Sequence, residues 1–110
     1  MVVDVTLSAL SDPTRRRVVE LLRQGPQRAG QLAAATGASA PVMSRHLRIL
    51  REGGLVEVEL DNDDGRGRVY HLCRQPFSDL HAWLDQVQAF WDEQLGAFKE
   101  HAERTRRSRR

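Results

Sequence analysis

Apolar side chains recur at intervals of three or four residues over four stretches in the first half of the chain, which is the spacing of helices with one buried face. In the second stretch, Asp12 is the expected N-cap, Pro13 opens the helix and Gly25 ends it. In the fourth, Ser39 is the expected N-cap and the glycine pair 53–54 ends the helix. The predicted helices cover residues 3–10, 13–24, 28–36 and 39–52.

The spacing changes to two in the next segment. Residues 55–60 alternate apolar side chains with Glu57 and Glu59, as in a strand with one buried face. Residues 61–65 are rich in Asp, Asn and Gly, the composition of a turn, and residues 68–72 are the returning strand. These segments together predict a β-hairpin.

A long helix is predicted over residues 77–102, after Pro76. The fold class is therefore mainly α with a small β-hairpin, in the order α-α-α-α-β-β-α. Two helices joined by the tight turn at 37–39 and followed directly by a hairpin are typical of a winged helix-turn-helix.

The last predicted helix carries a continuous apolar stripe at steps of three or four residues, with Trp83 and Phe90 beside it. A chain of 110 residues has too little other surface to bury such a stripe, so we expect a two-fold dimer formed by this helix and residues 3–10. The alternative is that the stripe belongs to the core of one subunit. The residues expected in the dimer interface are Val5, Leu7, Phe77, Leu80, Leu84, Val87, Trp91, Leu95 and Phe98.

Charge is unevenly distributed, although the formal net charge is only +2. Residues 13–56 carry eight arginines and two acidic side chains, whereas residues 57–103 carry eleven acidic and four basic side chains. A basic segment beside an acidic one suggests that one face binds a polyanion. The arginine run 15–17 is interpreted as a solvated face, with contact to flanking phosphates as the alternative. We expect one domain over residues 1–103 and a disordered basic tail over 104–110.

Several classes of protein are disfavoured by composition. No apolar run approaches the length of a membrane span, and the first ten residues lack the features of a secretory signal. Cys73 is the single cysteine, so no intramolecular disulfide is expected and the reducing cytoplasm is the expected location. No pairing of a nucleophile with a base and no glycine-rich phosphate loop is present, so an enzyme is not expected.

Three stretches of the sequence resemble the ArsR/SmtB family of bacterial repressors: residues 9–22, 39–56 and 67–72. The second stretch contains the family pattern Ser-x-His-Leu, beginning at Ser44, and the resemblance extends over about residues 5–100. It implies a winged helix-turn-helix that represses transcription, near its own gene in the simplest case. Two-fold symmetry would then require a pseudo-palindromic operator on double-stranded DNA.

The helix over residues 39–52 is expected to enter the major groove. Arg45 is the candidate for base reading because its guanidinium matches the O6 and N7 acceptors of guanine. Ala40 and Val42 suit thymine methyl groups, and the resemblance implies that Ser44 and His46 face DNA, where they would bond phosphates. An ordinary solvated helix face is the alternative. The predicted DNA-binding residues are Ser39, Ala40, Pro41, Val42, Ser44, Arg45, His46, Arg48, Arg66 and Arg68.

No metal or cofactor is expected. The family's Cys-x-Cys metal signature would fall within residues 31–35, which contain no sulfur. A second family site is matched only at Asp79 and His81, because its other half falls on Asp92 and Leu95. The protein would then bind DNA constitutively or respond to an unidentified ligand. A winged helix that binds another protein through the acidic segment is the alternative function, and an activator is a third.

Overall fold

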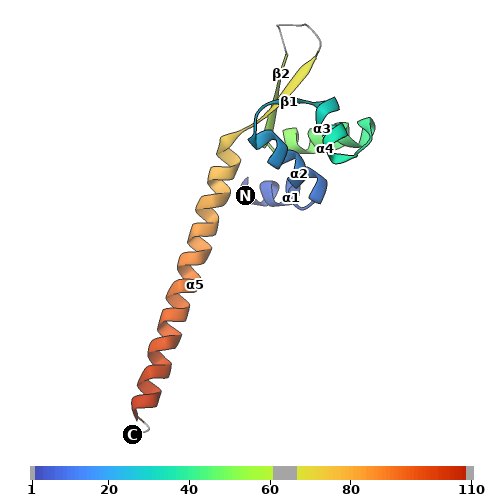
Figure 1. The fold of residues 1–110 in the computed structure, drawn as a ribbon. Helices are drawn as coiled ribbons and strands as arrows, with labels where there is room; N and C mark the ends of the chain where they lie inside the picture. Colours follow the sequence, from blue (N-terminus) through green and yellow to red (C-terminus); the bar gives the residue numbers. More distant parts are fainter. Residues whose placement is uncertain (1, 61–66, 109–110) are drawn as a thin grey trace. The chain divides into compact units, whose positions relative to one another are not determined.

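The computed structural model describes residues 2–60 and 67–108, and the predicted turn with Arg66 lies outside these residues. Two compact units are present, Met1–Asp79 and Leu80–Arg110. The elements, drawn in Figure 1, are α1 (Val2–Ala9), α2 (Pro13–Arg23), β1 (Gln27–Arg28), α3 (Ala29–Thr36), α4 (Ala40–Glu52), β2 (Val56–Leu60), β3 (Arg68–Leu72) and α5 (Arg74–Ser108).

Two helices begin at the N-cap side chains that the sequence predicted, and one ends at a glycine. The Asp12 carboxylate accepts a hydrogen bond from the backbone N–H of Arg15 at 3.0 Å, at the start of α2. The Ser39 hydroxyl accepts one from the N–H of Val42 at 3.3 Å, at the start of α4. Gly37 ends α3 with a φ of 76°, in the left-handed region that favours glycine. The turn between α3 and α4 is therefore specified by local chemistry.

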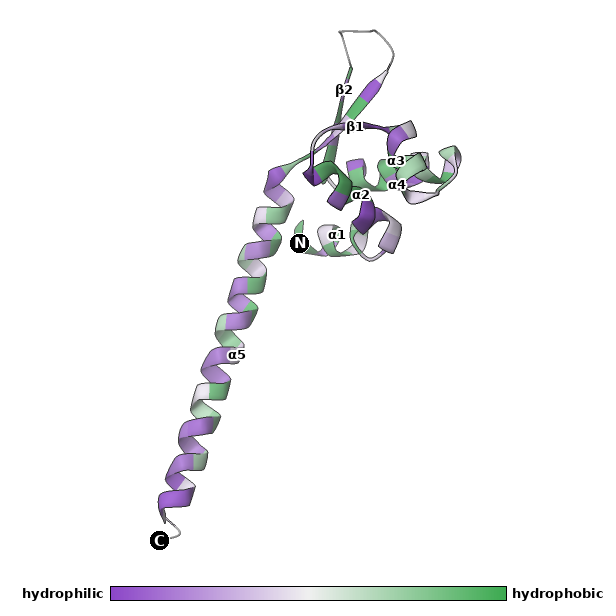
Figure 2. Cartoon of the chain, in the orientation of Figure 1, coloured by the Kyte–Doolittle hydropathy of each residue, from purple (hydrophilic) through white to green (hydrophobic). Residues whose placement is uncertain are grey.

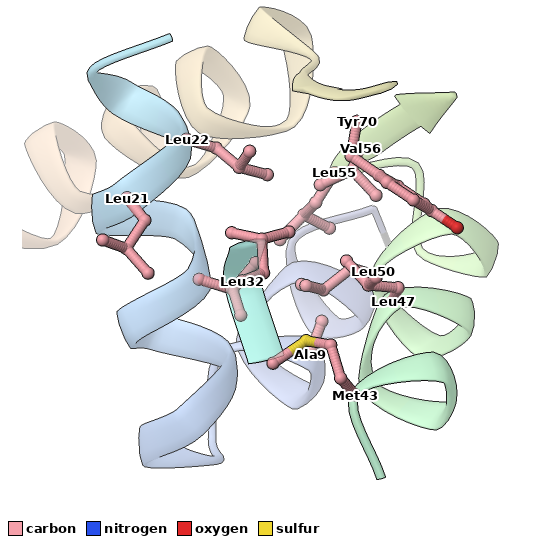
Figure 3. Close-up of a cluster of buried hydrophobic side chains, with 11 residues drawn as sticks. Ala9, Leu21, Leu22, Leu32, Met43, Leu47, Leu50, Leu55, Val56 and Tyr70 are labelled. Carbon is pink, nitrogen blue, oxygen red and sulfur yellow. The ribbon is translucent and has the colours of Figure 1, made fainter. Parts of the chain in front are cut away.

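The core of the first unit lies between α2, α3, α4 and the sheet. Leu32 of α3 is completely buried, and Figure 3 shows it between Leu21 and Leu22 of α2 and the side chains of α4. From α4, Met43, Leu47 and Leu50 have at most 1% of their surface exposed. This confirms the apolar stripe predicted along the fourth helix.

The sheet has three strands in the order β1-β3-β2, all antiparallel, where the sequence predicted a two-stranded hairpin. Val58 of β2 pairs with Tyr70 of β3, and Gln27 of β1 pairs with Tyr70 on the other side. A two-residue strand has no alternation that sequence reasoning could detect. It forms because the edge of β3 offers unpaired backbone groups to the segment that leads into α3.

The bounds of α5 differ from the prediction at both ends. The helix begins at Arg74, so that Pro76 lies inside its first turn, where a missing N–H costs no intrahelical hydrogen bond. It also continues to Ser108, so the disorder predicted from residue 104 is wrong for the described residues of that segment. Arg106 and Arg107 lie in the last turn, where positive charge interacts favourably with the helix dipole.

In unit Leu80–Arg110, the described residues 80–108 form one helical segment, and none of these residues is buried. Figure 2 shows hydrophobic positions recurring among hydrophilic ones along α5. The exposed fractions are 59% for Trp91 and Leu95 and 71% for Phe98. Over residues 2–60 and 67–108, no helix combines the length and the hydropathy needed to cross a membrane.

We expect Leu32→Ala to lower the free energy of unfolding by about 2–5 kcal/mol, because it removes a fully buried side chain from the centre of the core. Urea denaturation followed by circular dichroism, at one fixed protein concentration, measures this change. Leu60→Ala is the matched control: Leu60 is 72% exposed, so the cost should stay within about 0.5 kcal/mol. Equal losses for both variants would contradict the described core.

Candidate nucleic-acid interface

The helix α4 has one buried and one exposed face. Met43, Leu47 and Leu50 face the core, and because successive residues are turned by about 100° around a helix, Ser44 and Arg48 are directed outward. Val42 is half-buried at the edge between the two faces. The predicted DNA-binding residues that the structure leaves exposed on this helix and its N-cap are Ser39, Ala40, Pro41, Ser44, Arg45 and Arg48.

His46 is placed differently from these residues. Its side chain is only 12% exposed, and its ring nitrogens face the start of α2. The Nδ1 atom lies 3.3 Å from Nη1 of Arg15, and the Nε2 atom lies 4.0 Å from a carboxylate oxygen of Asp12. We expected this ring to face DNA phosphates, whereas the structure turns it towards the neighbouring helix.

Two arginines of the run 15–17 bind backbone carbonyls at the end of α1. Arg15 donates from Nε to the carbonyl of Ala9 at 2.6 Å, and Arg16 donates from Nη1 to the carbonyl of Leu10 at 2.9 Å. The carbonyls at the end of a helix have no intrahelical partner and lie at its negative pole, so arginine is well suited to them. The sequence predicted a solvated face for this run, which agrees with the exposed Arg16 and Arg17 but not with the half-buried Arg15. The signal that was missed is the short distance in sequence between the end of α1 and this basic run.

The carboxylate of Asp12 is part of the same cluster. Its hydrogen bond from the backbone N–H of Arg15 lowers the pKa of Asp12 below its ordinary value, against a smaller opposing effect of burial. The nearby His46 and the Arg15 guanidinium lower this pKa further. Asp12 is therefore ionised at neutral pH and can attract donors on both α2 and α4.

The described part of the wing carries one of its two predicted arginines. Arg68 is exposed at the start of β3, opposite Leu60 of β2. On the same hairpin, Nε2 of His71 lies 3.3 Å from a carboxylate oxygen of Glu57 and 4.0 Å from one of Glu59. The wing therefore presents positive charge near its described tip and a histidine with two carboxylates closer to the core.

An exposed, arginine-bearing helix after a tight turn, next to an antiparallel wing, defines a winged helix-turn-helix DNA-binding domain. Residues 12–58 match the family described as "Bacterial regulatory protein, arsR family". The chain belongs to the ArsR family, as its three motifs indicated, and it is a winged helix-turn-helix transcriptional regulator.

Individual relatives agree with this assignment. The chain is 37% identical over 95 residues to the HTH-type transcriptional regulator Rv2034 of Mycobacterium tuberculosis, covering 86% of this chain and 83% of that protein. It is 37% identical over 76 residues to the transcriptional repressor SdpR of Bacillus subtilis, covering 69% and 81%. Among solved structures, the homodimeric winged helix-turn-helix DNA-binding domain Mb0332 of Mycobacterium bovis matches with a TM-score of 0.61 and 30% identity, covering 86% and 82%.

The side chains considered as metal ligands in the sequence, such as Asp79 and His81, lie within the described residues. Within residues 2–60 and 67–108, no three His, Cys, Asp or Glu side chains are grouped so that they could hold a metal ion.

Cys73 follows β3 directly in the chain and is half-buried, and its backbone N–H donates to the carbonyl of Leu55 at 2.9 Å. Burial raises the pKa of the Cys73 thiol, and the charge of Glu57 and a hydrogen bond to it raise it further.

This raised pKa predicts that the thiol of Cys73 stays protonated to a higher pH in the folded protein than in the unfolded chain. The pH at which iodoacetamide alkylation is half-maximal should therefore be higher for the native protein than in urea. Because the folded pKa is the higher one, the thiol contributes stability at low pH that is lost as the pH rises through that value. Glu57→Gln should reduce the shift but retain the part caused by burial. A native midpoint at or below the unfolded one would contradict this environment.

Proposed function

We propose that the protein is a sequence-specific DNA-binding repressor that acts as a homodimer on a pseudo-palindromic operator near its own gene. The observation that carries the proposal is the exposed face of α4, where Arg45 and Arg48 extend from a helix whose opposite face is buried. The naming of the relative SdpR as a repressor supports the direction of regulation. Without that relative, an activator would fit the same surface.

The N-terminal half of α4 would enter the major groove. Arg45 would read a guanine through its bidentate guanidinium, and Ala40 and Val42 would contact thymine methyl groups. Ser44 would bond a phosphate and so fix the position of the helix along the groove. The N-cap Ser39, together with Pro41 and Arg48, would line the same groove. The wing would contribute Arg68 and also Arg66, which lies outside the described residues.

The dimer would be formed by α5 and α1. Along α5, Trp91, Leu95 and Phe98 are each more than half exposed, which is costly unless a second subunit covers them. On α1, Val5 and Leu7 are 49% and 42% exposed. The homodimeric Mycobacterium bovis domain supports a two-fold assembly. Its two recognition helices would bind half-sites about one helical turn apart, roughly 34–36 Å.

The remaining expectations follow from this function. Residues 1–103 would act as one DNA-binding and dimerisation unit, and the arginines of residues 104–110 would add affinity that does not depend on DNA sequence. The protein would work without a metal or cofactor and without catalysis. Its location would be the cytoplasm, where bacterial DNA lies.

Replacing Arg45 tests the assignment of base reading. We expect Arg45→Ala to weaken binding to the operator by about 1–3 kcal/mol, roughly 5- to 150-fold, while affinity for unrelated DNA changes much less. Gel-shift titrations on the DNA upstream of the gene and on a scrambled duplex measure both affinities. Arg51→Ala is the matched control, since Arg51 lies in the last turn of the same helix and should leave the selectivity unchanged. If the wild-type protein binds both duplexes equally or neither of them, the alternative function is favoured, in which the winged helix binds another protein through its acidic segment.

Introducing a charge into the stripe of α5 tests the dimer. Leu95→Glu should raise the dissociation constant of the dimer by about tenfold or more, because two symmetry-related carboxylates would enter an apolar interface. Gln94→Glu adds the same charge one position away and should have little effect. Sedimentation velocity measures both, with far-UV circular dichroism to verify that α5 stays helical. Equal dimerisation of the two variants would exclude Leu95 from the interface.

A further inference from the structure

One guanidinium group connects the end of α1 to the recognition helix. Arg15 donates to the carbonyl of Ala9 at 2.6 Å through Nε and to the carbonyl of Ser8 at 3.5 Å through Nη2. Its remaining terminal nitrogen, Nη1, lies 3.3 Å from Nδ1 of His46 on α4. The side chain therefore spans three elements: it belongs to α2, caps α1 and contacts α4.

The contact requires a particular arrangement of the ring. An arginine side chain can only donate hydrogen bonds, so a hydrogen bond between Nη1 of Arg15 and Nδ1 of His46 is made when Nδ1 is the acceptor and the ring hydrogen is on Nε2. That Nε2 faces the ionised carboxylate of Asp12 at 4.0 Å. Asp12 also accepts the backbone N–H of Arg15, so its position is fixed by the helix that it caps. The ring thus lies between the Arg15 guanidinium, 3.3 Å from Nδ1, and the Asp12 carboxylate, 4.0 Å from Nε2.

A second contact between α1 and α4 lies towards the other end of α4. A Cβ atom at Gly53 would lie 3.4 Å from Cγ1 of Val5, so this side chain packs against the C-cap of α4. An open surface pocket of about 370 Å³, lined in part by Ser8 and Ile49, lies between the exposed edges of α1 and α4. Ala9 of α1 belongs to the buried core that also contains Met43 and Leu47 of α4, so the Arg15–His46 contact adds a directed polar constraint to this apolar packing.

We infer that Arg15 and His46 are positioning residues, which hold the recognition helix at a fixed angle to α1 and thereby set the operator geometry. This inference rests on the proposed function, in which α1 lies in the dimer interface and α4 reads DNA. With α1 fixed against the partner subunit, a rotation of α4 relative to α1 would misalign both half-sites at once. Arg15 and His46 would act on selectivity without touching a base or a phosphate.

The test compares two DNA duplexes of equal length: one selected from a random pool by the wild-type protein, and a scrambled version of it. Arg15→Gln and His46→Leu should lower the ratio of the two affinities about tenfold, which corresponds to about 1.4 kcal/mol. The dependence of operator affinity on salt concentration should have the same slope for Arg15→Gln as for the control variant Arg17→Gln. That control removes the same charge from an exposed arginine of the same helix.

Two further variants separate positioning from loss of structure. His46→Asn places an amide oxygen near the position of Nδ1, so it should retain most of the selectivity that His46→Leu loses. The double variant Arg15→Gln with His46→Leu should lose less than the sum of the single losses, since both changes break one contact. Thermal unfolding and sedimentation velocity verify that each variant is folded and dimeric. If Arg15→Gln does not fold, the comparison of His46→Leu with His46→Asn decides alone.

The outcomes that overturn the inference are distinct from failure of the proposed function. A salt slope for Arg15→Gln that falls by about one beyond the Arg17→Gln control, with equal losses on both duplexes, would make Arg15 a phosphate contact. Unchanged selectivity in the folded variants, or no difference between His46→Leu and His46→Asn, would also contradict positioning. If the wild-type protein itself shows no selectivity, the proposed function fails first.

Discussion

The fold depends on the burial of one face of α4. Met43, Leu47 and Leu50 are removed from water against Leu32 and the side chains of α2, and this burial orients the helix within the first unit. Because a helix has two sides, the same burial places Arg45 and the rest of its exposed face on the surface. Stability and DNA recognition are therefore two consequences of one amphipathic pattern, and a change in the core would also move the reading surface.

The arginines of the first unit fall into two groups that composition does not distinguish. Arg45 and Arg48 are exposed and make no contact with α1, whereas the half-buried Arg15 and the exposed Arg16 bind the carbonyls that end α1. Counting the basic residues of this segment therefore gives too high a number of side chains in direct contact with phosphates. Part of its charge serves the internal geometry of the domain, where a guanidinium supplies several directed hydrogen bonds from one side chain.

The second unit displays apolar side chains on its surface, among them Trp91, Leu95 and Phe98, each of which is more than half exposed. A helix with this pattern is stabilised in water mainly by packing against another surface. A symmetric partner would supply that surface. In the proposed dimer, the fold of the first unit and the assembly of the protein would rest on the same physical effect, the burial of apolar side chains, once within a chain and once between chains.

The sequence by itself determined the features that local chemistry controls: the caps at Asp12 and Ser39, the glycine turn before α4, and which face of α4 is buried. It also predicted the strands β2 and β3 and the family. Tertiary structure decided the rest. The strand β1 exists because β3 offers it an edge, and the ring of His46 turns inward because Arg15, distant in sequence, presents a donor to it. Periodicity records which side of an element is apolar, but not which polar neighbour the fold brings beside it.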